Sequence, residues 1–70
     1  MNTDDLELIS SESIEYGAIL QRVINAAGVP YTIILVDGIE VWSTPTSDEK
    51  RMLEEWEKEG KSIVRLYRKD

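Results

Sequence analysis

The chain has 70 residues with 14 acidic and 8 basic side chains, which gives a net charge of −6, and it contains neither cysteine nor histidine. These absences exclude disulfides, thiolate nucleophiles, zinc clusters and sites that use histidine as a general base. The length fits one domain, residues 1–70, in which only about 60% of the unfolded chain's surface can be buried.

The first predicted element is a short strand over residues 5–9, where polar and apolar side chains alternate weakly. Thr3 followed by two aspartates could equally start a helix, so both alternatives stay open. Residues 1–10 are treated as an acidic N-terminal segment of the single domain.

A helix is predicted over residues 12–27, because apolar residues recur three and four positions apart. Ser11 can cap its start, and Gly28 followed by Pro30 can end it. The apolar positions are Tyr16, Ile19, Leu20, Val23, Ile24 and Ala27.

A β-hairpin is predicted over residues 31–44, because two β-rich runs flank Asp37-Gly38, a strong two-residue turn signal. Its expected register pairs Val36 with Ile39 and continues one residue at a time to Ile33 opposite Trp42. Alternation then gives the hairpin two faces. The face expected in the core carries Ile34, Val36, Ile39 and Val41, and the other carries Tyr31, Ile33, Leu35, Glu40 and Trp42.

A second helix is predicted over residues 46–59, where Thr46 and Glu49 form a capping box and Gly60 supplies the end. Residues 62–68 alternate and predict a last strand, with Val64 and Leu66 on one side.

The predicted fold class is α+β, a compact two-layer sandwich with the order (β)αββαβ. It is ferredoxin-like if residues 5–9 form a strand. Otherwise it is a three-stranded sheet with both helices on one face.

The hairpin face that carries Tyr31, Ile33, Leu35, Glu40 and Trp42 is the predicted partner-binding surface. Its two aromatic and two aliphatic side chains exceed the apolar patch that a monomer usually exposes. A partner protein or a second copy is therefore expected to cover it. The alternative is that the N-terminal segment folds over it.

The acidic charge is confined to the first part of the chain. Residues 1–40 carry seven acids and one base, a net charge of 1 − 7 = −6, and residues 41–70 carry seven of each. Such a distribution suits docking on a basic protein surface, with carboxylates imitating a nucleic-acid backbone. The acidic surface is assigned to Asp4, Asp5, Glu7, Glu12 and Glu15.

The function expected from the sequence is a small non-enzymatic inhibitor or regulator that docks on a basic surface of a nucleic-acid-processing or defence enzyme. The alternative is an oligomerising module that forms a homodimer through the same sheet face or its edge. No catalytic residue, metal or cofactor is predicted. Direct nucleic-acid binding is not expected at a pI near 4.5, nor is a membrane span, and the expected location is the cytoplasm.

Overall fold

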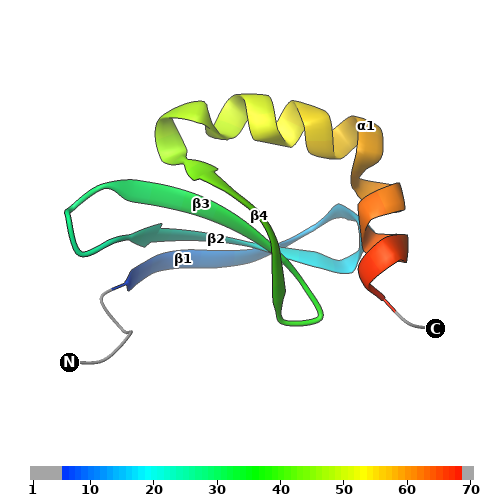
Figure 1. The fold of residues 1–70 in the computed structure, drawn as a ribbon, viewed down its shortest axis with the longest axis horizontal. Coiled ribbons are helices and arrows are strands. Elements are labelled where there is room, and N and C mark those ends of the chain that lie inside the picture. Colours follow the sequence, from blue (N-terminus) through cyan, green and yellow to red (C-terminus); the bar gives the residue numbers. More distant parts are fainter. Residues whose placement is uncertain (1–5, 69–70) are drawn as a thin grey trace.

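Four consecutive antiparallel strands form one sheet, and a single long helix covers one of its faces (Figure 1). This computed structural model describes residues 6–68. Each strand pairs with its neighbour in sequence, in the order β1-β2-β3-β4. The elements are β1 (Glu7–Ile14), a 3-10 turn η1 (Glu15–Gly17), β2 (Ala18–Ile24), β3 (Pro30–Val36), β4 (Ile39–Pro45), a 3-10 turn η2 (Thr46–Asp48) and α1 (Glu49–Tyr67).

The predicted class, α+β in two layers, is confirmed, but the predicted element order with two helices is wrong. The fold is therefore not ferredoxin-like. The strand predicted over residues 5–9 corresponds to β1, which begins at Glu7 and continues to Ile14.

The helix predicted over residues 12–27 is instead the end of β1, η1 and β2. The chain reverses at Tyr16 and Gly17, which both have positive φ angles, 67° and 75°. β2 lies between β1 and β3, so both of its faces are apolar: Ala18 and Leu20 belong to the core under α1, whereas Val23 is buried on the opposite face. A central strand with two apolar faces lacks strict alternation, and its apolar spacing here matched a helix.

The predicted hairpin is confirmed, with Asp37 and Gly38 at φ angles of 52° and 81° in its turn. The register departs from the prediction after Leu35 pairs with Glu40, because a β-bulge places Ile34 opposite Trp42. A bulge adds one residue to one strand and so shifts the pairing beyond it.

The bulge also changes which hairpin residues reach the core. Ile34 and Val36 are buried as predicted, but Ile39 is 49% exposed. Val41 is only partly buried, and it packs against the core together with Trp42. Trp42 therefore lies on the α1 side of the sheet, across from Ile34.

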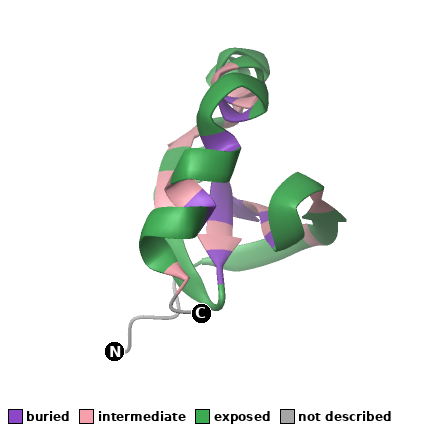
Figure 2. Ribbon diagram, turned by 90° about the vertical axis from the view of Figure 1, so that its right-hand side faces the viewer, coloured by how far each residue is buried: buried purple, intermediate pink, exposed green. Residues whose placement is uncertain are grey.

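The helix does not end at Gly60, and the strand predicted over residues 62–68 is wrong, because α1 continues to Tyr67. Its buried residues are Met52, Trp56, Gly60 and Val64, one in every four. Gly60 is thus part of the buried stripe of α1. Figure 2 shows buried positions on the side of the helix that faces the sheet. An added Cβ there would lie 2.7 Å from Cε2 of Trp56, so the indole packs directly against the glycine.

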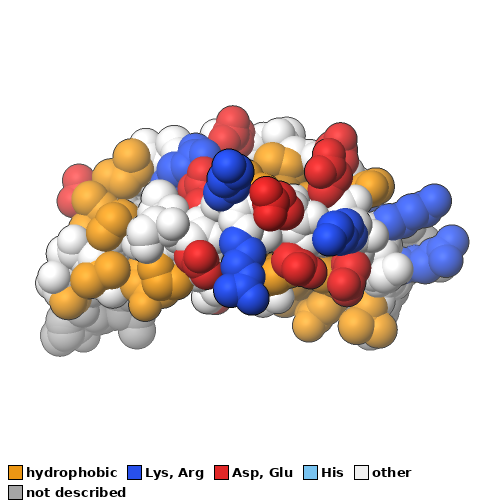
Figure 3. All heavy atoms as spheres, turned by 90° about the horizontal axis from the view of Figure 1, so that it is seen from above, with side chains coloured by type: hydrophobic (Ala, Val, Ile, Leu, Met, Phe, Trp, Pro, Cys, Tyr) orange, Lys and Arg blue, Asp and Glu red, His pale blue; other side chains and the backbone are white. Residues whose placement is uncertain are grey.

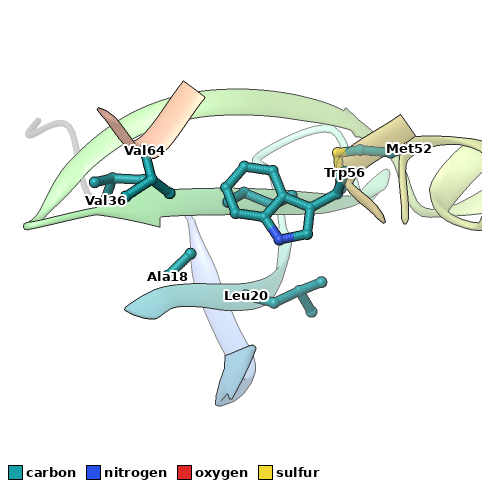
Figure 4. Close-up of a cluster of buried hydrophobic side chains, with 7 residues drawn as sticks. Ala18, Leu20, Val36, Met52, Trp56 and Val64 are labelled. Atoms are coloured by element: carbon teal, nitrogen blue, oxygen red, sulfur yellow. The ribbon is translucent and has the colours of Figure 1, made fainter. Parts of the chain in front are cut away.

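The core lies between this stripe and strands β2 and β3. Trp56 fills the middle of the layer, between α1 and the side chains of Ala18 and Leu20 (Figure 4). Tyr16 packs on the indole with ring centroids 6.1 Å apart, which joins η1 to the helix. The main contacts of α1 are with β3, β4, η1 and η2. The edge strand β1 is not among these main contacts, and a groove opens between its last residue and the first half of α1.

Candidate functional site

A network of polar side chains fastens the first turn of α1 to the sheet. Arg22 on β2 donates two parallel hydrogen bonds to Glu49, from Nε to Oε1 at 2.9 Å and from Nη2 to Oε2 at 2.8 Å. Thr32 on β3, which is fully buried, donates to Oε1 of Glu49 at 2.7 Å. The Thr32 hydroxyl also lies 3.1 Å from that of Thr46.

This network replaces the predicted capping box. Neither η2 nor α1 begins with a side-chain cap hydrogen bond, because the side chains of Thr46 and Glu49 are engaged with the sheet. Ser10, Arg22, Thr32 and Thr44 form one row across the four strands, on the α1 side. Two residues of this row, Arg22 and Thr32, are therefore the hydrogen-bond donors to Glu49.

Electrostatics keep Glu49 and Arg22 ionised. The hydrogen bond from Arg22 lowers the pKa of Glu49 against the opposing effect of burial, and the bond from Thr32 lowers it further. The same hydrogen bond raises the pKa of Arg22, which also contacts Glu12 at 3.2 Å. A carboxylate held in this state is a poor general acid or base near neutral pH, so its geometry indicates a structural role.

The groove begins beside this network and has a cavity volume of about 650 Å³. One wall is the end of β1 with η1, and the other is η2 with the first half of α1. Its lining residues are Ile14, Glu15, Thr46, Ser47, Glu49, Lys50, Leu53, Glu54, Trp56 and Glu57. Apolar side chains at the floor and charged side chains at the rim are typical of sites that bind another molecule.

The rim of the groove is acidic. Glu15 stands on the strand wall, and Glu54 and Glu57 stand on the helix wall, all exposed. Lys50 is the one basic residue in the lining. Within residues 6–68, ion pairs are made by Arg22 and Arg68 only, so these three rim carboxylates are not neutralised there.

Trp56 contributes an unusual polar atom to the groove. The side chain lines the groove and is only 3% exposed, yet its indole Nε1 has no hydrogen-bond acceptor within residues 6–68. Figure 4 shows this nitrogen directed away from α1, toward the strand that carries Leu20. A buried N–H without an acceptor costs about 1–3 kcal/mol, so an incoming acceptor would be stabilised there.

The predicted partner-binding residues do not form one surface. Tyr31, Ile33, Leu35 and Glu40 lie on the sheet face opposite α1, whereas the bulge places Trp42 on the helix side. Ile33 is buried, and Tyr31 and Leu35 are half-buried. The predicted surface therefore loses its tryptophan and much of its exposed apolar area.

The predicted acidic surface is partly brought together. Glu7, Glu12 and Glu15 are exposed along β1 and η1, and Glu15 belongs to the groove. Asp4 and Asp5 lie outside the described residues. The alternative that the N-terminal segment folds over the open face does not hold for the described part, because β1 extends the sheet.

Sequence reasoning missed the groove because its strand wall was assigned to a helix. Two signals of the polar network beside the groove were nevertheless present in the sequence. Thr46 and Glu49 have the spacing of a capping box, and Arg22 is the lone base in the first 40 residues. Glu54 and Glu57 lie within the predicted helix over residues 46–59, and no pattern in the sequence relates them to Glu15. Their position opposite Glu15 becomes visible only in three dimensions.

The opposite end of α1 is basic. Lys61, Arg65 and Arg68 line a second hollow with Tyr16 and Val64. Seen from above the helix, basic side chains project at this end, whereas hydrophobic side chains gather at the other (Figure 3). Arg68 is held in place by hydrogen bonds to the carbonyl of Gly17 at 3.2 Å and to Asp37 at 3.4 Å.

Comparison with family models, curated proteins and solved structures gives no match for this chain. None of the helices within residues 6–68 has the length and apolar content needed to cross a bilayer. In the same part of the chain, no three acidic side chains converge in a group that could hold a metal ion. A functional argument therefore depends on the groove and its charge.

Proposed function

We propose that this chain is a small non-enzymatic interaction protein that docks its acidic groove on a basic surface of another protein. The observation that carries the proposal is the placement of exposed carboxylates on both walls of the groove, Glu15 facing Glu54 and Glu57, with Lys50 as the single base. Carboxylates on opposite walls can contact a basic side chain from two sides. Their field also accelerates the encounter with a basic partner.

The partner class that suits this surface is an enzyme that processes nucleic acid or acts in defence, with the present chain as its inhibitor or regulator. Glu7, Glu12 and Glu15 present carboxylates at intervals along one side of the sheet. Such an array can occupy a groove that evolved for phosphates, since both offer closely spaced negative charge to lysine and arginine. Mimicry of a nucleic-acid backbone is the mechanism we propose.

The test is affinity capture from the source cell's lysate with identification of the retained protein and an activity assay on it. Two variants with the same change in net charge are compared, Glu54→Gln/Glu57→Gln in the groove and Glu40→Gln/Glu59→Gln outside it. We expect a basic enzyme to be captured and inhibited by the wild type and by E40Q/E59Q, but not by E54Q/E57Q. Binding should weaken about tenfold as salt rises from about 50 to 200 mM. Capture that is equal in the two variants would contradict the proposal.

Self-association is a second candidate function, favoured by the apolar start of β1. Leu6, Leu8 and Ile9 are each more than half exposed, and Leu8 continues the row of Val23 and Tyr31 on the open face. A second copy could cover this row. Light scattering tests it: a dimer that Leu8→Ser converts into a monomer supports the candidate, and a monomeric wild type at high concentration eliminates it.

A further inference from the structure

One wall of the acidic groove is the free edge of the sheet. β1 is the first strand in the order β1-β2-β3-β4, so its outer side pairs with no other strand within residues 6–68. The edge is eight residues long, and six of those residues are exposed. An unpaired edge offers alternating N–H and C=O groups. An extended segment can pair with these groups and so add a further strand to the sheet.

The groove lies directly beside the C-terminal part of this edge. Ile14, the last residue of β1, and Glu15, the residue after it, line the groove, and Glu12 shares the α1 side of the strand with Ile14. Side chains of a strand alternate between the two faces of a sheet. An added strand would therefore direct every second side chain toward the groove.

The charge around the edge selects the occupant. Glu15 stands on the strand side and Glu54 and Glu57 on the helix side, so side chains that enter between them are favoured when they are cationic. A second copy of this chain is disfavoured, because it would bring another net charge of −6 to the same acids. Charge complementarity thus indicates a basic segment.

We propose that an extended segment of a partner protein, with lysine or arginine at alternate positions, pairs with the outer edge of β1. Its basic side chains enter the groove between the acids of the two walls. This inference rests on the proposed function and specifies it: the basic surface of the partner is a β-strand or an unfolded segment that becomes one.

The probe is a nine-residue peptide in which arginine alternates with threonine, blocked at both ends, titrated into the ¹⁵N-labelled full chain. We expect perturbed amides along β1 and the groove side of α1. The E54Q/E57Q variant should bind about tenfold more weakly, and E40Q/E59Q should bind like the wild type.

Two further peptides test the strand pairing. N-methyl groups are placed on the arginines in one peptide and on the threonines in the other, which removes the N–H donors from opposite edges of the same extended segment. We expect one of them to lose binding and the other to bind within about twofold of the parent.

Several outcomes would overturn this inference while leaving the proposed function intact. They are equal binding of the two methylated peptides, or no peptide binding by a chain that still captures a basic protein through Glu54 and Glu57. A dimer whose interface includes β1 would also overturn it, in favour of a second copy. The proposed function itself fails if capture does not depend on these acids.

Discussion

Replacing Gly60 by alanine tests the central packing contact of the molecule. The glycine lies in the buried stripe of α1, and an added Cβ would stand 2.7 Å from Cε2 and 2.8 Å from Cδ2 of Trp56. On the other side it would stand 3.0 Å from Cδ2 of Tyr16. Both distances to the indole are shorter than carbon atoms tolerate, so the ring must move.

The sign of the effect follows from two opposing terms. Alanine favours an ordinary helix position over glycine by about 1 kcal/mol. Overpacking a closed site costs typically about 1–3 kcal/mol, and this site is closed, because Trp56 is only 3% exposed and Tyr16 packs against its ring. Because the added Cβ would meet two ring atoms at less than 3.0 Å, we expect a cost of about 2–3 kcal/mol from overpacking, so that Gly60→Ala lowers the free energy of unfolding by about 1–2 kcal/mol in net.

Urea unfolding followed by far-UV circular dichroism measures this loss, with Glu59→Ala as the control. Glu59 precedes Gly60 in the same helix but is exposed, so its variant reports helix propensity without the clash. The midpoint for G60A should fall while that for E59A stays nearly constant. If G60A is as stable as the wild type or more stable, the indole does not lie against the glycine and the account of the core is wrong.

Three other predictions concern the surface and the polar network. Because the hydrogen bond from Arg22 lowers its folded-state pKa, Glu49 stabilises the fold at neutral pH and loses this effect as the pH falls through that lowered pKa. E49Q should cost about 1–3 kcal/mol at pH 7 and flatten the dependence of the urea midpoint on pH. Arg68→Ala should cost at most about 1 kcal/mol and speed amide exchange in the last turn of α1, and unchanged exchange would show that its contacts with Gly17 and Asp37 do not hold that turn. Tyr31→Ser should leave partner capture intact, because Tyr31 lies on the open face, and loss of capture by a folded variant would move the binding surface there.

The hairpin could be predicted because its signal is local. Asp37 and Gly38 adopt the positive φ angles that a two-residue turn needs, and the flanking residues favour strands whatever lies around them. The bulge after Leu35 has no comparable signal. It moves Trp42 from the open face to the core side, so an error of one residue removed the main anchor from the predicted site.

The elements that were predicted wrongly depend on tertiary contacts. In residues 18–24, Ala18 and Leu20 need α1 above them and Val23 needs the other side of the sheet, and only the pairing with β1 and β3 separates this strand from a helix. Gly60 is a helix stop by composition. Its neighbour in space, the Trp56 indole, makes it a packing position instead.

The order of the elements along the chain has a consequence for synthesis. All four strands precede α1, which supplies Met52, Trp56 and Val64 to the core. A ribosome-bound chain that ends before residue 49 carries all four strands but lacks the helix that covers Leu20 and Ile34, so the two-layer core can form only after α1 has been made.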